Sequence, residues 1–411
     1  MNQATLVATG TNTRPSLYRT GVLHTLRKFS HGHLALTLPD GTSLDLGAGP
    51  GHSPAAQLLV HDEDFFRDLA LHAGVGLGES YIDGLWSSPD LRAVVTWLIT
   101  NIRAEHKLRG SSQRLPLVGL LKIADRVAHL LRPNSLKTSR RNISEHYDLG
   151  NDFYRLWLDP SLTYSSAKFT SDDQPLEDAQ RAKYDALCQK LHLRQSDHVL
   201  EIGCGWGGFS IHAASTYGCR VTAVTISQAQ FDEATTRVKT AGLDQLVTVV
   251  LKDYRLLTGS FDKIASIEML EAVGDRYLAT YFKKCHQLLA PDGILALQYI
   301  NVPDNEHADL RKGTDFIQKH IFPGSLLLSN TRIAKTLNRT GDLDLVSFED
   351  LTASYARTLG IWYDRFNAVL DDVHALGFDD RFVRKWNFYL KYCEAAFATR
   401  NIGVVQAAYT R

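Results

Sequence analysis

Two glycine-rich strings in the sequence have the composition of a loop that binds a nucleotide-like ligand. One occupies residues 47–51, and the other reads Leu200-Glu201-Ile202-Gly203-Cys204-Gly205-Trp206-Gly207-Gly208. Glycines after a strand let the backbone approach a ligand closely, and the helix that follows points its first N–H groups at that ligand. Only the second string is expected to bind, because the six residues between Gly51 and the apolar run 58–60 are too few for a crossover helix.

The position of an acidic residue indicates which ligand the second string takes. Gly203, Gly205 and Gly208 fit the dinucleotide pattern G-x-G-x-x-G, which requires an acid near the end of the next strand to hold a ribose. That strand ends Thr225-Ile226-Ser227, and the acid stands instead before the loop, at Glu201. A carboxylate beside bare glycine amides suits the zwitterionic amino-acid part of S-adenosylmethionine better than a pyrophosphate. The residues therefore favour S-adenosylmethionine, with a nicotinamide dinucleotide as the alternative.

The elements expected around this string alternate between strand and helix. Apolar patterns predict strands at 198–202, 221–226, 246–251, 264–267 and 294–299, and helices at 208–217, 228–241 and 276–289. Further helices are expected near 331–339, 354–370 and 381–398, and strands at 343–349 and 404–409. Such alternation is typical of an α/β fold with a mostly parallel sheet and helices on both faces.

A smaller α+β unit is expected before this sheet. The sequence predicts a hairpin at 34–38 and 43–46, a helix at 62–73, a glycine-rich turn region at 74–86 and a helix that ends near residue 102. Residues 101–141 then carry ten basic and two acidic side chains, and a leucine-rich helix is expected at 115–131. This change of composition predicts a domain boundary, with an N-terminal lipid-docking or accessory domain at 1–125 and the α/β domain at 126–411.

Composition disfavours several classes of protein. The 411 residues are 44% apolar and 22% charged, as in folded proteins, and the 45 basic and 45 acidic residues cancel, which disfavours a dedicated nucleic-acid binder. Five separated cysteines, and a His31 and His33 pair without a third ligand, indicate neither a disulfide framework nor a metal site. Residues 1–15 lack an apolar signal core, and no run approaches the roughly 18 apolar residues of a membrane span. We therefore expect a cytoplasmic protein that reaches any membrane from the surface.

The sequence resembles the cyclopropane-fatty-acid synthases, a family that includes the mycolic acid cyclopropane and methyl-branching enzymes. The matching strings are at residues 146–152, 162–165, 201–208, 224–230, 253–255 and 362–363, with Gly76-Leu77-Gly78-Glu79-Ser80-Tyr81-Ile82-Asp83-Gly84 before the boundary. The resemblance covers roughly residues 60–411. It implies a seven-stranded, doubly wound, Rossmann-like methyltransferase sheet with a smaller N-terminal α+β domain, and S-adenosylmethionine as methyl donor.

The resemblance also implies which residues line the donor site. By matching position these are Tyr164, Ser165, Gly203, Gly205, Thr225, Gln230, Tyr254 and Arg255, to which the loop itself adds Glu201 and Gly207. Tyr254 follows the third strand of the sheet, where a flat aromatic ring could stack on adenine. His146-Tyr147 is expected in a lid over donor or substrate, with an ordinary helix face as the alternative.

The family acts on a cis double bond within an acyl chain of a membrane phospholipid. The alkene attacks the sulfonium methyl, and loss of a proton from the new methyl closes a cyclopropane ring. In the family a bound bicarbonate is proposed as the base, held by a Cys, a Glu, a His, a backbone group at an Ile, and a Tyr. Glu271, Ile300 and Tyr363 match this set, whereas Ser166 stands at the Cys position and Gln298 at the His position.

These departures leave the product open. Ser and Gln can still hydrogen-bond a carboxylate-like anion, so a bound bicarbonate remains compatible with the sequence. The leading hypothesis is a C-methyltransferase that forms cyclopropane fatty acids. The alternatives are an enzyme that makes methyl- or methylene-branched chains, a non-catalytic lipid-binding protein and, on fold alone, a small-molecule N- or O-methyltransferase. Glu268 is expected at the surface or behind the site.

The expected partners follow from a lipid substrate. The basic side chains between residues 103 and 141 could dock on anionic headgroups, each contact contributing about 1 kcal/mol. The helix expected at 115–131 would lie either in the membrane interface or between the domains. The enzyme is thus predicted to bind unsaturated membrane phospholipids peripherally, at the inner face of the membrane, with no nucleic acid and a homodimer as a possible assembly.

Overall fold

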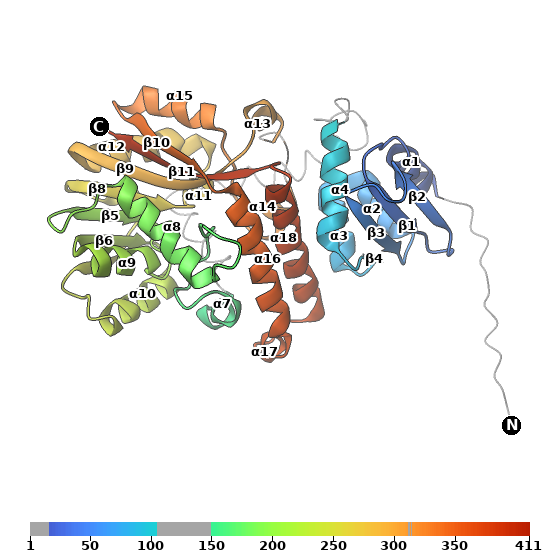
Figure 1. Cartoon of the computed structure of the whole chain (residues 1–411), viewed down its shortest axis with the longest axis horizontal. Coiled ribbons are helices and arrows are strands. Elements are labelled where there is room, and N and C mark those ends of the chain that lie inside the picture. The colour runs from blue at the N-terminus through green and yellow to red at the C-terminus, as the bar shows by residue number, and fades with distance from the viewer. Residues whose placement is uncertain (1–15, 105–148, 311–312, 314) are drawn as a thin grey trace.

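The computed structural model of the chain describes residues 16–104, 149–310, 313 and 315–411. These residues build a large sheet flanked by helices and, at the other end of the molecule, a small sheet with its own helices (Figure 1). The helix expected at 115–131, the His146-Tyr147 string and the boundary at 125/126 lie outside the described residues. The two-domain division therefore stays a prediction.

The large sheet has seven strands in the order β10-β11-β9-β8-β5-β6-β7. The strands from β9 to β7 in this order run parallel, whereas β11 runs antiparallel to both β9 and β10. Their bounds are β5 His198–Ile202, β6 Arg220–Thr225, β7 Val247–Leu251, β8 Phe261–Ile267, β9 Leu289–Asn301, β10 Asp344–Asp350 and β11 Gly403–Thr410. The predicted seven-stranded, mostly parallel α/β sheet is confirmed.

Helices cover both faces of this sheet, and each face has its own hydrophobic core. α8 (Leu176–Lys190) and α9 (Gly208–Tyr217) pack on one face, and α12 (Leu278–Leu288) and α15 (Asn330–Thr340) pack on the other. The central strands are apolar nearly throughout because neither of their faces meets water. The remaining helices near the site are α7 Asn151–Trp157, α10 Gln228–Thr240, α11 Leu270–Val273, α13 Asp304–Leu310, α14 Phe316–His320, α16 Thr352–Ala368, α17 Leu370–Ala375 and α18 Asp380–Ala398.

The small unit is built on a four-stranded sheet of order β2-β1-β3-β4. Its elements are α1 Leu17–Leu26, β1 His33–Thr37, β2 Ser43–Gly47, β3 Ala55–Val60, α2 Asp64–His72, α3 Gly74–Ile82, β4 Trp86–Ser87 and α4 Leu91–Ala104. The predicted hairpin is confirmed as the antiparallel pair of β1 and β2. After the first glycine string the chain enters β3 without an intervening helix, as its short spacing predicted.

The turn region predicted at 74–86 is wrong over most of its length, because residues 74–82 form helix α3. Its glycines serve close packing rather than reversal of the chain. A Cβ atom on Gly76 would lie 2.0 Å from the carbonyl oxygen of Asp68 in α2, and one on Gly78 would lie 2.3 Å from the ring of Phe316 in α14. Helices approach this closely only where the side chain is a hydrogen atom.

The small unit packs directly against the helices beside the large sheet. The guanidinium of Arg384 in α18 donates to the carbonyl oxygens of Tyr81 and Trp86, at 2.6 and 3.1 Å. Glu79 accepts from His320 and forms an ion pair with Lys319, both at 2.8 Å. One hydrophobic core runs from the small sheet to α16 and α18. The small unit therefore supports helices that, as shown below, form a wall of the cavity.

Replacing Gly78 by alanine is expected to destabilise the chain by about 1–3 kcal/mol, the usual cost of overpacking a filled core. The new methyl group would meet the rings of Phe316 and Phe388, both buried. Gly74→Ala is the matched control, since that residue belongs to the same helix and no atom lies within 4 Å of the added Cβ. Denaturant unfolding of the two variants measures the difference, and equal stabilities would contradict the packing role of Gly78.

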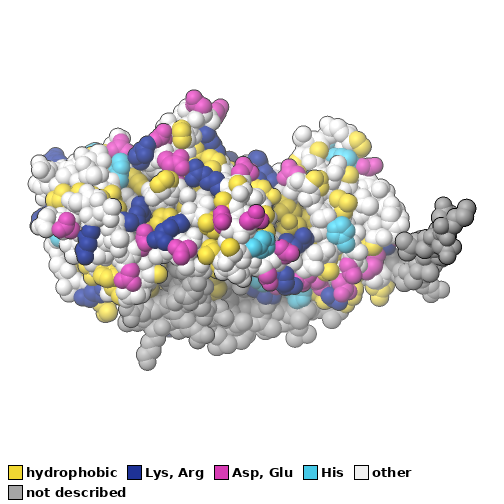
Figure 2. Space-filling model, turned by 90° about the horizontal axis from the view of Figure 1, so that it is seen from below, with side chains coloured by type: hydrophobic (Ala, Val, Ile, Leu, Met, Phe, Trp, Pro, Cys, Tyr) yellow, Lys and Arg dark blue, Asp and Glu magenta, His cyan; other side chains and the backbone are white. Residues whose placement is uncertain are grey.

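No helix among the described residues is long and apolar enough to cross a membrane. On the face shown in Figure 2, basic and acidic side chains of the described residues are interspersed. Most of the basic residues counted between 103 and 141 lie outside the described part of the chain. The expected contact with anionic headgroups therefore stays a prediction.

Candidate active site

A cavity of about 370 Å³ opens at the carboxyl ends of the parallel strands. One wall consists of the residues that follow β5, β6, β7 and β8, which is where α/β sheets bind their ligands. The opposite wall comes from α14, α16 and α18. The strand ends contribute glycines and polar groups, and the helices contribute mainly apolar and aromatic side chains such as Leu359 and Phe397.

The glycine loop after β5 adopts a backbone that requires glycine. Gly203, Gly205 and Gly207 have φ angles of +85°, +52° and +86°, in the left-handed region that other residues avoid. Gly203 and Gly205 line the cavity, and no atom lies within 4 Å of the place where a Cβ of Gly205 would be. Gly207 is outside the lining and precedes α9 as its N-cap. The loop thus turns bare backbone toward the cavity.

Glu201 lines the cavity next to this loop. Its side chain is buried, lines the cavity and accepts a hydrogen bond from the hydroxyl of Ser210 in α9. Burial raises the pKa of Glu201 to about 8, although Ser210 and the ammonium of Lys183 act in the opposite direction. A ligand that brings a positive charge would favour the ionised carboxylate, as the predicted contact with an amino-acid moiety requires.

The residues predicted around an adenosine also meet at the cavity. The hydroxyl of Thr225 donates to the Oε1 atom of Gln230 over 2.9 Å, and both residues line the cavity. Tyr254 lies at the rim of the sheet, and its ring faces the edge of Tyr281 at 5.4 Å. Arg255 is held by an ion pair of 2.6 Å with Asp253. Residues that are far apart in the sequence thus gather on one side of the cavity.

Ser165 and Tyr164 line the cavity on its other side, and Ser165 leads to a residue that the sequence analysis missed. The hydroxyl of Tyr164 shares a hydrogen bond of 2.8 Å with that of Tyr389. Ser165 accepts a 2.7 Å hydrogen bond from the ammonium of Lys183, which is fully buried in α8. Burial lowers the pKa of Lys183 to about 7 against the pull of Glu268, Asp159 and Glu201. Only the placement of a lysine among apolar positions of a helix could have revealed it.

Glu268 lies at the centre of the site, so the expectation of a surface position is wrong. It follows β8 directly and lines the cavity. Its Oε1 atom accepts hydrogen bonds from the backbone N–H of Ser166 at 2.8 Å and from the side-chain amide of Gln298 at 2.7 Å. Its Oε2 atom accepts one from the hydroxyl of Tyr355 at 2.9 Å. Counting along the sequence could not place it, because these donors come from three separate segments.

Glu271 lines the same cavity with far fewer partners. Its carboxyl group accepts a hydrogen bond from the backbone N–H of Ile300, and its Oε2 atom has no partner among the described residues. Burial and the neighbouring Glu268 raise the pKa of Glu271 to about 8. Three hydrogen bonds favour the charge on Glu268, so within the pair a proton is held more readily by Glu271.

Two of the residues predicted to hold a bicarbonate, Ser166 and Gln298, are bonded to other groups of the chain. The backbone N–H of Ser166 and the amide of Gln298 are already bonded to Glu268, and neither residue is part of the cavity lining. The hydroxyl of Ser166 donates to the carbonyl oxygen of Ala167 at 2.9 Å, and the Oε1 atom of Gln298 accepts from Gln406 at 3.1 Å. The donors expected for an external anion are therefore used within the chain.

Tyr363 is also outside the cavity lining. It is half-buried, and the ammonium of Lys391 lies 4.0 Å from its ring centre. Tyr355, about two turns earlier in α16, lines the cavity and bonds to Glu268 instead. Adjacent residues of a helix face different directions, and here Trp362 is the fully buried member of the Trp362-Tyr363 string. The predicted role of Tyr363 stays a prediction.

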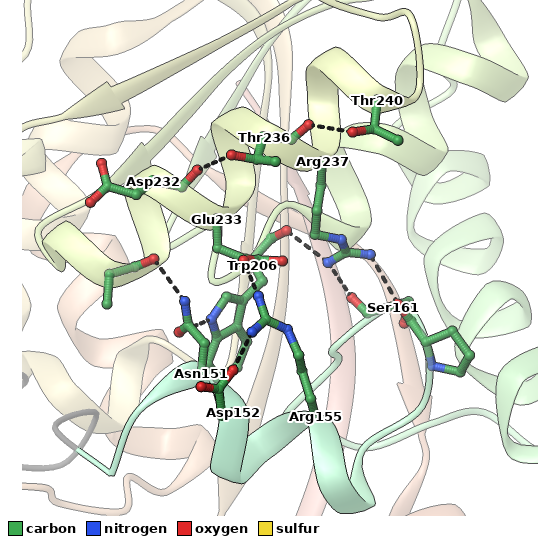
Figure 3. A network of polar contacts seen from close by, with 12 residues as sticks. Asn151, Asp152, Arg155, Ser161, Trp206, Asp232, Glu233, Thr236, Arg237 and Thr240 are labelled. Carbon is green, nitrogen blue, oxygen red and sulfur yellow. Dashed lines mark hydrogen bonds and ion pairs between the residues drawn. The ribbon is translucent and has the colours of Figure 1, made fainter.

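A polar network braces the glycine loop from outside the cavity (Figure 3). Arg237 in α10 donates to the carbonyl oxygens of Ser161 and Trp206, at 2.7 and 2.8 Å. The indole N–H of Trp206 donates to Asn151 in α7 at 2.8 Å. Arg155 in α7 is paired with Glu233 in α10. The network ties α7, α10, the loop and the segment before Tyr164 into one support.

Removing the guanidinium of Arg237 is expected to weaken donor binding about tenfold. In Arg237→Ala the carbonyl oxygens of Ser161 and Trp206 lose their donor, and an unpaired buried polar group costs about 1–3 kcal/mol. Calorimetric titration with S-adenosylhomocysteine measures the effect. Lys239→Ala, an exposed change in the same helix, is the control and should bind as the wild type does. Equal affinities of the two variants would show that the loop keeps its shape without Arg237.

The sheet, the glycine loop and the cavity at the strand ends, together with the family and the relatives given next, define the class of protein: the chain is an S-adenosylmethionine-dependent methyltransferase. The chain belongs to the family described as mycolic acid cyclopropane synthetase, whose sequence pattern it matches over residues 134–407. The family predicted from the sequence motifs is thereby confirmed.

Two relatives span nearly the whole chain. Tuberculostearic acid methyltransferase UfaA1 of Mycobacterium tuberculosis is 37% identical over 399 residues, which make up 92% of this chain and 88% of that protein. The cyclopropane-fatty-acyl-phospholipid synthase of Escherichia coli K12 is 37% identical over 361 residues, which make up 87% of this chain and 89% of that protein. The chain is thus similar to lipid-modifying enzymes along both its described units.

Solved structures match about two thirds of the chain. The cyclopropane synthase MmaA2 of Mycobacterium tuberculosis is 30% identical, with a TM-score of 0.62, and covers 66% of this chain and 98% of its own. The mycolic acid cyclopropane synthase CmaA1, solved with SAH and CTAB, is 29% identical, with a TM-score of 0.61 and the same coverage. These likenesses agree with S-adenosylmethionine as the cofactor of the site described above.

Proposed function

We propose that this enzyme transfers a methyl group to the cis double bond of unsaturated acyl chains in membrane phospholipids and forms cyclopropane fatty acids. The observation that carries the proposal is a cavity with two contrasting sides: the glycine loop and the carboxyl groups of Glu201, Glu268 and Glu271 face apolar and aromatic side chains of α16 and α18. The helix side suits an acyl chain, and the acidic side suits a carbocation and the removal of its proton. The name of the Escherichia coli relative supports this substrate.

The donor-binding roles remain the ones inferred from the sequence. Glu201, Gly203 and Gly205 would hold the amino-acid part, with Gly207 shaping the loop. The adenosine and the sulfonium would lie among the cavity-lining side chains Thr225, Gln230, Tyr254, Arg255, Tyr164 and Ser165. When bound there, the donor supplies an electrophilic methyl group. The chain itself orients the two substrates and excludes water from the cation that forms.

A branching enzyme is the second candidate. It would leave a methyl or methylene branch, because a different proton is lost from the same cation. The observation that favours it is the 37% identity to tuberculostearic acid methyltransferase over 92% of the chain. Peripheral contact with the membrane through residues 101–141, and assembly as a homodimer, belong to the proposal as well.

The test is incubation of the purified chain with S-adenosylmethionine and vesicles of phosphatidylglycerol that carries oleoyl chains. Gas chromatography and mass spectrometry of the methyl esters should show a product one CH₂ heavier that resists mild hydrogenation. A heavier product that is still unsaturated would instead support methylene or methyl addition. No heavier product, with donor binding intact, would contradict both candidates and favour a non-catalytic lipid-binding protein.

A further inference from the structure

Three hydrogen-bond donors from separate parts of the chain converge on the carboxylate of Glu268. The backbone N–H of Ser166 comes from the loop before α8, the amide of Gln298 from β9, and the hydroxyl of Tyr355 from α16. Each of these donors stabilises the ionised form of the carboxyl group. The acceptor at their centre is part of the protein and lines the cavity.

The backbone conformation of Glu268 also indicates that its side chain is held in a specific place. Its φ angle of +49° lies in the left-handed region, where a residue with a side chain is strained by roughly 1–2 kcal/mol. Strain of this kind persists where the surroundings over-determine the conformation, and it is common at active sites. Here the three hydrogen bonds to the carboxylate hold Glu268 in this conformation. A glycine would be the favoured residue for this backbone, so the glutamate adopts it at a local cost.

Glu268 also lies beside the donor loop. The next residue, Met269, packs against Gly203, whose Cβ would lie 2.9 Å from the Met269 Cγ atom. The hydroxyl of Ser266 at the end of β8 donates to the carbonyl oxygen of Ile202 at 2.8 Å, so the two strand ends are fixed to each other. The methyl group of a donor held by the glycine loop would therefore enter the same cavity that this carboxylate faces.

The groups around Glu268 and Glu271 favour ionisation of Glu268 over that of Glu271. Burial raises the pKa of Glu268, and the three hydrogen bonds and the ammonium of Lys183 lower it. Glu271 lacks comparable partners, and its raised pKa leaves the proton there. Within the pair, the negative charge is therefore favoured on the oxygen atoms that Ser166, Gln298 and Tyr355 contact.

We propose that Glu268 is the general base of this enzyme, a carboxylate built into the chain at the position expected for a bound bicarbonate. The inference rests on the proposed function. After the alkene has been methylated, a C–H bond of the new methyl breaks and its proton forms an O–H bond with Glu268. The electron pair of that C–H bond forms the second C–C bond of the ring. The donors expected to hold bicarbonate instead hold Glu268, and the reaction requires no added anion.

Activity in carbon-dioxide-free buffer tests the proposal. The wild type should release S-adenosylhomocysteine from oleoyl phosphatidylglycerol vesicles at the same rate with and without bicarbonate. Glu268→Gln should be slower by about 100-fold or more, the typical contribution of a general base. Glu268→Gly, which suits the left-handed backbone, should be equally slow without bicarbonate and regain part of its rate when bicarbonate is added. Asp292→Gly, an exposed acid with a φ of +61° and outside the cavity lining, should behave as the wild type does.

Bicarbonate binding provides a readout that does not depend on turnover. With S-adenosylhomocysteine bound, ¹³C NMR of labelled bicarbonate should show saturable binding to Glu268→Gly and none to the wild type. Binding to the wild type, a bicarbonate requirement of the wild type, or full activity of Glu268→Gln would overturn the inference. Failure of Glu268→Gly to bind bicarbonate would overturn it too. A wild type that binds donor and methylates no unsaturated lipid would instead refute the proposed function, and the NMR result would still decide whether Glu268 fills the anion position.

Discussion

Replacing Gly205 by valine is expected to abolish binding of the methyl donor while the chain remains folded. Gly205 has a φ of +52° and lines the cavity, and no atom lies within 4 Å of its Cβ position. The open space at this position is where the donor is expected to lie, so the valine methyl groups would occupy part of its site. The left-handed backbone adds strain of about 1–2 kcal/mol for a residue with a side chain. We expect affinity for S-adenosylhomocysteine to fall by at least about 100-fold, which corresponds to about 3 kcal/mol.

Gly242 offers a matched control for this substitution. It has a φ of +68°, and no atom lies within 4 Å of its Cβ position, but it is exposed after α10 and does not line the cavity. Gly242→Val should thus carry a similar backbone strain and bind the donor as the wild type does. Calorimetric titration and thermal unfolding of both variants separate the two effects. Normal affinity in Gly205→Val would mean that the donor does not approach this part of the loop.

Replacing Lys183 by methionine is expected to reduce activity at pH 7 by about 100-fold, in the range of a lost general base, without lowering the unfolding temperature. The ammonium of Lys183 is fully buried and favours the ionised forms of Glu268 and Glu201. Without that positive charge, the pKa of Glu268 rises further and so does that of Glu201, so a smaller fraction of each group is ionised at neutral pH. Lys183 is thus a positioning residue that acts through the carboxylates. Methionine has a similar length and avoids the cost of burying a charge, so we expect the stability of the fold to change little.

The pH profile distinguishes this role from a structural one. Because the pKa of Glu268 should rise in Lys183→Met, the ionised base returns only at higher pH, and the rate should recover as the pH increases. Arg181→Met, an exposed change in the same helix, should leave the profile unchanged. A uniform loss of activity at every pH, or a lowered unfolding temperature that accounts for it, would contradict the electrostatic role.

Local patterns of the sequence were sufficient for most of the large sheet. The strand at 198–202 and the helix at 208–217 are found with the predicted bounds, and the others agree to within a few residues except at the extended β9. The reason is that apolar runs, helical spacing and the short loops of an α/β unit are local signals. The glycine loop was recognised for the same reason, since its residues are adjacent in the chain. Helix α3 was missed because the packing partners of Gly78 are residues 316 and 388, far away in the sequence.

The sequence by itself determined the fold class, the family and the donor loop, because these depend on residue types at fixed short spacings. Only the tertiary structure shows which carboxyl group is surrounded by hydrogen-bond donors. Ionisation depends on the donors and charges that surround a group, and those of Glu268 come from β9, α16 and the segment before α8. For the same reason, only the structure shows that Tyr355 lines the cavity and that Lys183 reaches Ser165 there. Burial and convergence are properties of the folded chain, and no spacing along the sequence encodes them.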